Sequence, residues 1–168
     1  MSFLDRIAAA LAPAATDEQR IEARKRLEQM ARGEPFAEEI LAQHRAIEGL
    51  FADARQNSGP DAQAIVHGLA VLLNAHAMAE EAVIYPEVSQ NSGKAHAGMA
   101  YEEHAMTKVQ PGSQEWHEKL DHIESAVQQH VYQEESSWLP DVIRYAPVEA
   151  RQRMSAKFTE YFGRVELA

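Results

Sequence analysis

Two stretches of the chain carry the same pattern of histidine and glutamate. One begins at His76 and the other at His130; they align without gaps and share the histidine, two consecutive glutamates, a proline and a valine. Residues four apart on a helix lie on one face, so His76 is expected over Glu80 and His130 over Glu134. Imidazole nitrogens and carboxylate oxygens both bind transition metals. Each repeat therefore presents two groups that could hold the same cation.

Two further histidines extend this set. His44 lies in an apolar stripe with Ile40 and Ile47, and His104 shares a helical face with Tyr101. One histidine from each of four segments is thus predicted to point into the core. Burying four histidines and two glutamates without compensation would cost several kcal/mol, which favours joint coordination of metal. A hydrogen-bonded polar core without metal is the alternative.

Six inward-facing residues form the predicted ligand set: His44, His76, Glu80, His104, His130 and Glu134. Six nitrogen and oxygen ligands exceed the needs of one tetrahedral zinc ion, and two glutamates in pseudo-symmetric positions suit a bridged pair of ions. We expect two non-haem iron ions, with manganese as the alternative metal. The ferritin-like di-iron bundles use Glu-x-x-His, which this chain lacks, so the sequence excludes that class.

The composition narrows the function classes further. The chain has 168 residues, of which 45% are hydrophobic, as in one globular domain with a buried core, and it has no cysteine, which excludes thiolate sites. Sixteen Lys and Arg against 26 Asp and Glu give a net charge of −10, which argues against nucleic acid and anionic membranes as partners. No apolar run approaches the roughly 20 residues of a membrane helix. Asp5 and Arg6 interrupt the apolar N-terminus, so we expect no signal peptide and a cytoplasmic protein.

Four helix-length segments must position these ligands. Turn-forming residues separate them, and none shows the alternation typical of a strand. Short connections make neighbouring helices antiparallel. The sequence therefore predicts an all-α fold, an antiparallel up-down four-helix bundle over residues 35–143. Its helices are expected at residues 36–56, 61–88, 94–109 and 114–139.

Each end of the chain adds a helical segment. Residues 1–34 are expected to form an N-terminal helical arm, with a short amphipathic helix up to Pro13 and a second helix capped by Thr16. The arm would dock on the protein's own core or on another chain, either as a homodimer contact or as a surface for a protein partner. Residues 144–168 carry a further helix after Pro147, which is expected to pack on the bundle.

Taken in order, these motifs resemble the hemerythrin HHE cation-binding family. The resemblance covers about residues 36–142 and implies a non-haem di-iron centre inside an antiparallel four-helix bundle. It also implies that the histidines are terminal ligands and that Glu80 and Glu134 bridge the irons. Members include dioxygen carriers, dioxygen or redox sensors, and proteins of iron-centre repair or of peroxide and nitric oxide defence. The residues that carry the resemblance are His44, His76-x-x-x-Glu80-Glu81 with Tyr85-Pro86, Glu103-His104, and His130-x-x-x-Glu134-Glu135 with Leu139-Pro140.

The chain departs from the dioxygen carriers in the third predicted helix. The carriers place two histidines four residues apart there, whereas Ala100 and Lys108 flank His104. Tyr101 or water would then fill the vacant position, unless Tyr101 only packs as an aromatic side chain. A site with fewer histidines favours reaction with dioxygen, peroxide or nitric oxide over reversible storage.

Three other carboxylates lie near the predicted ligands. Glu48 follows His44 by four residues and is a weaker ligand candidate. Glu81 and Glu135 lie about 100° around the helix from the ligand glutamates. We therefore expect these two at the surface or hydrogen-bonded to a ligand rather than on the metal.

Three functions are compatible with these residues. The first is a hemerythrin-like di-iron protein that binds or reacts with a small oxidant, which includes enzymatic consumption of peroxide or nitric oxide. The second is an iron, oxygen or redox sensor that acts through a protein partner. The third is a bundle whose metal is purely structural. We expect the first.

Overall fold

The computed structural model describes residues 14–84, 86 and 109–166, and every regular element within them is helical. The short helix predicted before Pro13 and the helix predicted at residues 94–109 lie outside the described residues, so the up-down order of four helices stays a prediction. The described elements are α2 (Asp17–Met30), α3 (Pro35–Gln56), α4 (Gly59–Val83), α7 (Gln114–Gln133), a π-helical turn (Glu134–Trp138), α8 (Leu139–Tyr145) and α9 (Val148–Glu166).

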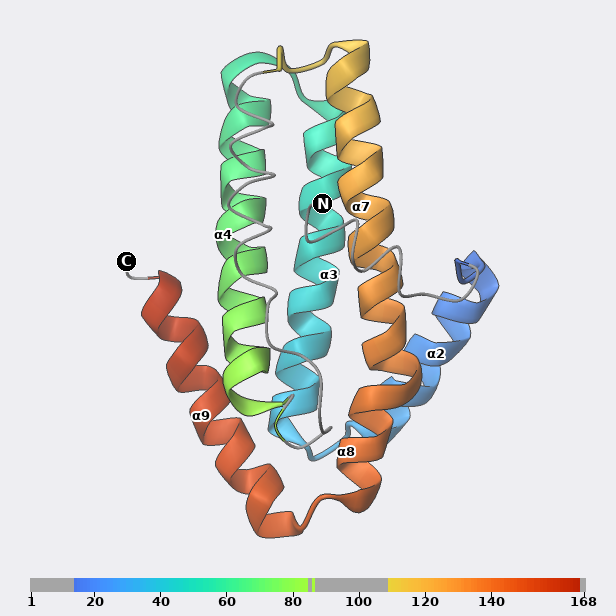
Figure 1. The fold of residues 1–168 in the computed structure, drawn as a ribbon, viewed down its shortest axis with the longest axis vertical. Helices are drawn as coiled ribbons and strands as arrows, with labels where there is room; N and C mark the ends of the chain where they lie inside the picture. Colours follow the sequence, from blue (N-terminus) through green and yellow to red (C-terminus); the bar gives the residue numbers. More distant parts are fainter. Residues whose placement is uncertain (1–13, 85, 87–108, 167–168) are drawn as a thin grey trace.

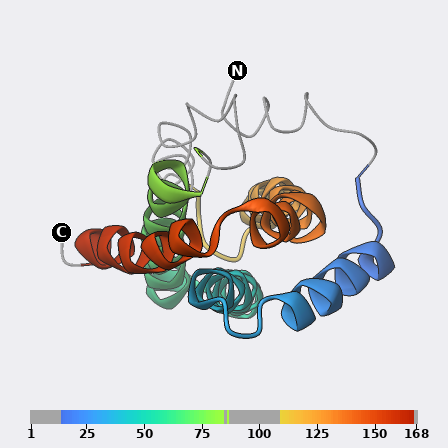
Figure 2. The same ribbon diagram turned by 90° about the horizontal axis from the view of Figure 1, so that it is seen from below.

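Three long helices lie side by side along the long axis of the molecule (Figure 1). α3 runs in the opposite direction to α4 and α7, so the two His-Glu repeats lie on parallel helices. The outer helices flank this group: α2 packs on α7, α8 and the π-helical turn, and α9 crosses α4 and α3 on the other side (Figure 2).

Local signals explain where the helices begin. Thr16 caps α2 as predicted: its side chain accepts a hydrogen bond from the Gln19 amide, and the Gln19 side chain accepts one from the Thr16 amide. The Ser113 side chain caps α7 by accepting a hydrogen bond from the Trp116 amide. Gly112, just before this cap, has a φ of 84°, a conformation that a side chain would strain.

Two predicted helix ends differ from the structure. α4 ends at Val83 rather than at residue 88, and Pro86 follows, which lacks the N–H needed to continue the helix. The segment predicted at 114–139 is regular only to Gln133 and continues as the π-helical turn. Pro140 cannot donate to the carbonyl of Ser136, and Arg26 of α2 donates to that carbonyl instead, at 3.2 Å.

The apolar side chains form two separate clusters. The upper core joins α3, α4 and α7 and includes Phe51 and Trp116. The lower core joins α2, α3, α4, α8 and α9 and includes Leu27, Phe36 and Phe158, all with no exposed surface. α2 and α9 therefore contribute fully buried side chains to the same core as α3 and α4.

A polar layer separates the upper core from the lower core. On α3 the lower core ends at Leu41 and the upper core begins at Ile47, and the layer lies between them. Within the described residues, every buried polar or charged side chain belongs to this layer: Gln43, His44, His76, Glu80, Glu134 and Glu135. The fold thus places one enclosed group of ligand-type side chains between two apolar clusters.

α4 has the length and the apolar composition of a membrane helix. By these two criteria alone it could cross a membrane, whereas no apolar run of that length is predicted from the sequence. Half of its apolar window is buried within the protein, and His76 and Glu80 on the same helix face the polar layer. The apolar character of α4 is that of a helix packed between α3 and α9.

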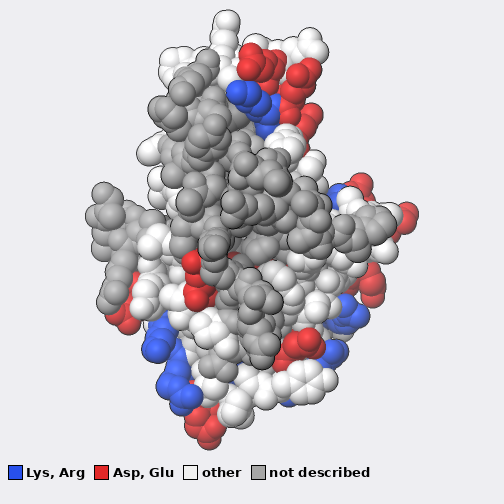
Figure 3. All heavy atoms as spheres, in the orientation of Figure 1, with Lys and Arg blue, Asp and Glu red and all other residues white. Residues whose placement is uncertain are grey.

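The charged side chains of the described surface are mixed in sign. On the face shown in Figure 3, Lys and Arg lie next to Asp and Glu. Arg45 of α3 and Glu28 of α2 form an exposed ion pair at 2.6 Å. The side chains of the polar layer are buried, and these surface charges are exposed, so the two sets do not overlap.

Candidate metal centre

Four buried side chains bring ligand atoms together in the polar layer. They are His44 of α3, His76 and Glu80 of α4, and Glu134 of the π-helical turn. One ligand atom from each lies within 4.8 Å of all the others. Nitrogen and carboxylate oxygen atoms at this spacing can share one cation or a pair of cations.

His130 of α7 borders this group. Its Nε2 lies 2.9 Å from Oε1 of Glu134 and 3.8 Å from Oε2 of Glu80. The side chain is 20% exposed, whereas the other four are almost completely buried. Five of the six predicted ligands are therefore brought together; the sixth, His104, lies outside the described residues, as does Tyr101.

Two hydrogen bonds orient His44 from opposite sides. Its Nδ1–H donates to Oε1 of Glu135 at 2.8 Å, and its Nε2 lies 3.1 Å from Oε2 of Glu134. Burial by itself would lower the pKa of His44, but the hydrogen bonds and charges of Glu134 and Glu135 raise it to about 9. Because Nδ1 is engaged by Glu135, Nε2 is the nitrogen that faces the ligand group.

His76 presents a ring nitrogen with no hydrogen bond. Its Nδ1–H donates to the side-chain oxygen of Gln43 at 2.7 Å, which directs Nε2 toward Oε1 of Glu80, 3.3 Å away. This buried Nε2 has no hydrogen-bond partner. Burial and the charge of His44 lower the pKa of His76 to about 3, so the ring is neutral at ordinary pH. A neutral imidazole with a buried, unused lone pair is what a cation requires.

The two glutamates carry opposite pKa shifts. Burial and the charge of Glu134 raise the pKa of Glu80 to about 8. Burial would also raise the pKa of Glu134, but the charge and hydrogen bond of His130, with those of His44, hold it well below its usual range. Two buried carboxylates this close need a proton or a cation between them. The donor set therefore fits a metal centre: His76 supplies a free lone pair, and a cation would take the place of the proton.

The three remaining candidate carboxylates lie outside the ligand group. Glu48 is 44% exposed and pairs with Arg24 of α2 at 2.6 Å. Glu81 is partly exposed. Glu135 is buried and hydrogen-bonded to His44, which is one of the two positions expected for it.

Two side chains that orient the ligand candidates are not predicted from the sequence. Gln43 holds His76, and its position had a signal: it falls in the apolar stripe of Phe36, Ile40 and Ile47 at helical spacing. Arg24 of α2 holds Glu135, and no periodicity marks that residue among the other charged residues of its helix.

Cation binding is expected to release protons. The pKa values of about 9 for His44, about 10 for His130 and about 8 for Glu80 mean that these groups hold protons at neutral pH without metal. Burial would lower the pKa of His130, but the charge and hydrogen bonds of Glu134 and Glu80 raise it. Since a bound cation must displace these protons, we expect release of about two to three protons and an affinity that rises with pH up to about pH 10, the pKa of His130. Calorimetric titration in buffers of different ionisation enthalpy measures the proton count; a pH-independent affinity would contradict the expectation.

Comparison with known proteins agrees with this arrangement. Residues 36–142 match the hemerythrin HHE cation binding domain. No curated protein and no solved structure matches the chain. The matched residues contain all five described ligand candidates and more than half of the chain. The chain therefore belongs to the hemerythrin HHE cation-binding family.

Proposed function

We propose that this chain is a non-haem di-iron protein that binds or reacts with a small oxidant such as dioxygen, peroxide or nitric oxide. The observation that carries the proposal is the buried cluster of His44, His76, Glu80 and Glu134, into which Nε2 of His76 points without a hydrogen bond. His130 borders the cluster through Glu134. Nitrogen and oxygen ligands without thiolate favour iron, with manganese as the alternative.

A bound iron pair would supply one-electron chemistry toward such an oxidant. The chain's own residues would hold the cations, fix the rings and exclude water. Gln43 and Glu135 fix the rings of His76 and His44 through their Nδ1 atoms. The almost complete burial of His44, His76, Glu80 and Glu134 between the upper and lower cores favours a small molecule as the reactant.

Iron-supplied protein is expected to contain about two iron ions per chain, because five described ligand candidates and His104 exceed the four ligands of a tetrahedral ion, and two glutamates can bridge a pair of ions. Metal analysis together with absorption spectra of anaerobic protein, before and after addition of dioxygen, peroxide or nitric oxide, measures this. A spectrum that changes with oxidant supports the proposal. A folded protein that takes up one ion or fewer contradicts the di-iron assignment, and a colourless zinc protein indicates a structural metal.

Sensing is a second candidate function. The observation that favours it is a hydrogen-bonded link from α2, outside the matched domain, to the ligand candidate His44 through Glu135. Turnover distinguishes the two functions. Catalytic consumption of peroxide or nitric oxide by purified protein indicates an enzyme, whereas a stable change of state without turnover indicates a sensor.

A further inference from the structure

Arg24 of α2 hydrogen-bonds two glutamates, Glu135 and Glu48, beside the candidate metal centre. Its Nε and Nη2 donate to Oε1 of Glu135 at 3.0 and 2.8 Å, and Nε also lies 3.1 Å from Oε2. Its Nη1 donates to Oε2 of Glu48 at 2.6 Å. One guanidinium thus joins α2 to the π-helical turn and to α3. A planar fork of donors can hold two carboxylates in this geometry, whereas a lysine ammonium would keep the positive charge but not the fork.

Glu135 connects Arg24 to His44. The same oxygen that Arg24 binds, Oε1, accepts the hydrogen bond from Nδ1 of His44 at 2.8 Å. The Glu135 side chain is only 2% exposed and that of His44 is fully buried. A carboxylate buried to this extent needs a positive partner, and Arg24 is a permanent one.

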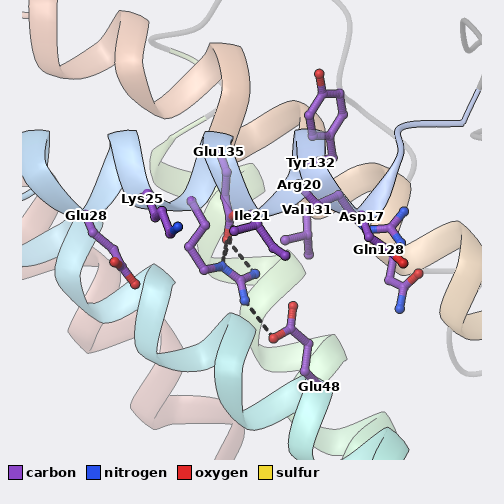
Figure 4. A pocket seen from close by; sticks show the side chains of 11 residues that line it. Asp17, Arg20, Ile21, Lys25, Glu28, Glu48, Gln128, Val131, Tyr132 and Glu135 are labelled. Carbon is purple, nitrogen blue, oxygen red and sulfur yellow. Dashed lines mark hydrogen bonds and ion pairs between the residues drawn. The ribbon is translucent and has the colours of Figure 1, made fainter.

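The Arg24 contact lies in a pocket between α2, α3 and α7. The pocket has a volume of about 560 Å³, and Glu48 and Glu135 approach its centre from opposite sides, where dashed lines join them to one guanidinium (Figure 4). The Arg24 side chain is 21% exposed. The link therefore runs from a solvent-accessible pocket to a fully buried ligand candidate.

We propose that Arg24 is a positioning residue of the metal centre, which holds Glu135 against His44 and so couples the docking of α2 to cation binding. Arg24 and α2 precede the matched domain, so this role adds an element to the centre. Glu135 fixes Nδ1 of His44 and turns Nε2 toward Glu134 and the cation. Coupling is reciprocal: if α2 strengthens cation binding, a bound cation stabilises α2 on the bundle by the same factor.

The test compares Arg24→Gln with Arg45→Gln. Arg45 is the matched control, because it joins α3 to Glu28 of α2 without reaching Glu135. Titration with Co²⁺, followed by its visible absorption, gives affinity and ligand geometry together. We expect Arg24→Gln to weaken Co²⁺ binding about ten- to a hundredfold and to change the spectrum. Arg45→Gln is expected to stay within about twofold of wild type, and Arg24→Lys to recover part of the loss.

Hydrogen exchange of α2 provides a second readout. Addition of Co²⁺ is expected to slow exchange in α2 of wild type and Arg45→Gln, and to have no such effect in Arg24→Gln. Wild-type affinity and spectrum in Arg24→Gln, or an equal loss in Arg45→Gln, would overturn the proposal. If Arg24→Gln does not fold, Glu135→Gln decides, because it keeps the shape and removes the charge that Arg24 binds; wild-type Co²⁺ binding by that variant overturns the proposal.

The inference rests on the proposed function only in requiring a cation at this site. If Co²⁺ binding depends on Arg24 but the iron form does not react with oxidants, the proposed function is wrong. The proposed coupling between α2 and cation binding then still holds. A wild-type chain that binds no cation contradicts the proposed function itself. The ring nitrogen chemical shifts of His44 then decide: Arg24→Gln must alter them relative to wild type, and unchanged shifts overturn the positioning role.

Discussion

Glu80→Ala and Glu134→Ala are each expected to weaken cation binding more than about a hundredfold. Glu134 contacts His44 and His130 at 3.1 and 2.9 Å, and Glu80 contacts His76 at 3.3 Å and His130 at 3.8 Å. Each carboxylate therefore touches two of the histidine candidates. Each substitution removes one candidate ligand. It also leaves the neighbouring histidine rings without the carboxylate that they contact. Metal analysis and Co²⁺ titration of folded variants measure the loss.

Glu81→Ala is the matched control for this pair of variants. Glu81 follows Glu80 on the same helix, but it is partly exposed and lies outside the cluster of ligand atoms. We expect Glu81→Ala to retain the metal. A loss as large as that of Glu80→Ala would show that the helical face assigned to Glu80 is wrong.

Phe158→Ala is expected to lower the free energy of unfolding by about 3–5 kcal/mol. Phe158 of α9 has no exposed surface and lies in the lower core with Phe36 and Leu139. Truncation leaves a cavity in the lower core, where α9 packs against α4 and α3. Urea unfolding followed by circular dichroism measures the change.

Tyr145→Ala provides the control for that measurement. Tyr145 ends α8, is 78% exposed and is expected to change stability by less than about 0.5 kcal/mol. A Phe158→Ala loss below about 1 kcal/mol would mean that α9 is not integral to the lower core. The predicted role of residues 144–168 as a helix packed on the bundle depends on this result.

The two His-Glu repeats show why identical motifs can have different surroundings. Both repeats place two consecutive glutamates four residues after a histidine. On α4 the second glutamate, Glu81, is partly exposed, whereas Glu135 is buried against His44. The difference arises at the π-helical turn, which widens the helix at Glu134 and lets both glutamates reach the same ring. Such turns are frequent at functional sites, and in this one Arg26 donates to the Ser136 carbonyl, to which Pro140 has no N–H to donate.

The sequence by itself determined the ligand candidates and the helical faces that carry them. A period of 3.6 residues places His44, His76 and Glu134 among apolar neighbours, and a buried polar residue in such a stripe needs a partner. Helix starts were also readable, because the cap at Thr16 involves only residues three apart.

Only the tertiary structure decided what holds the ligands in place. Gln43 and His76 are 33 residues apart, and Arg24 and Glu135 are 111 apart, so no local pattern links them. The Ser136 carbonyl of the π-helical turn likewise accepts a hydrogen bond from Arg26 of α2, 110 residues away. Ligand faces follow from the geometry of one helix, which is local. The hydrogen bonds that orient those ligands form only when distant helices pack together, so their partners cannot be deduced from the periodicity of either helix alone.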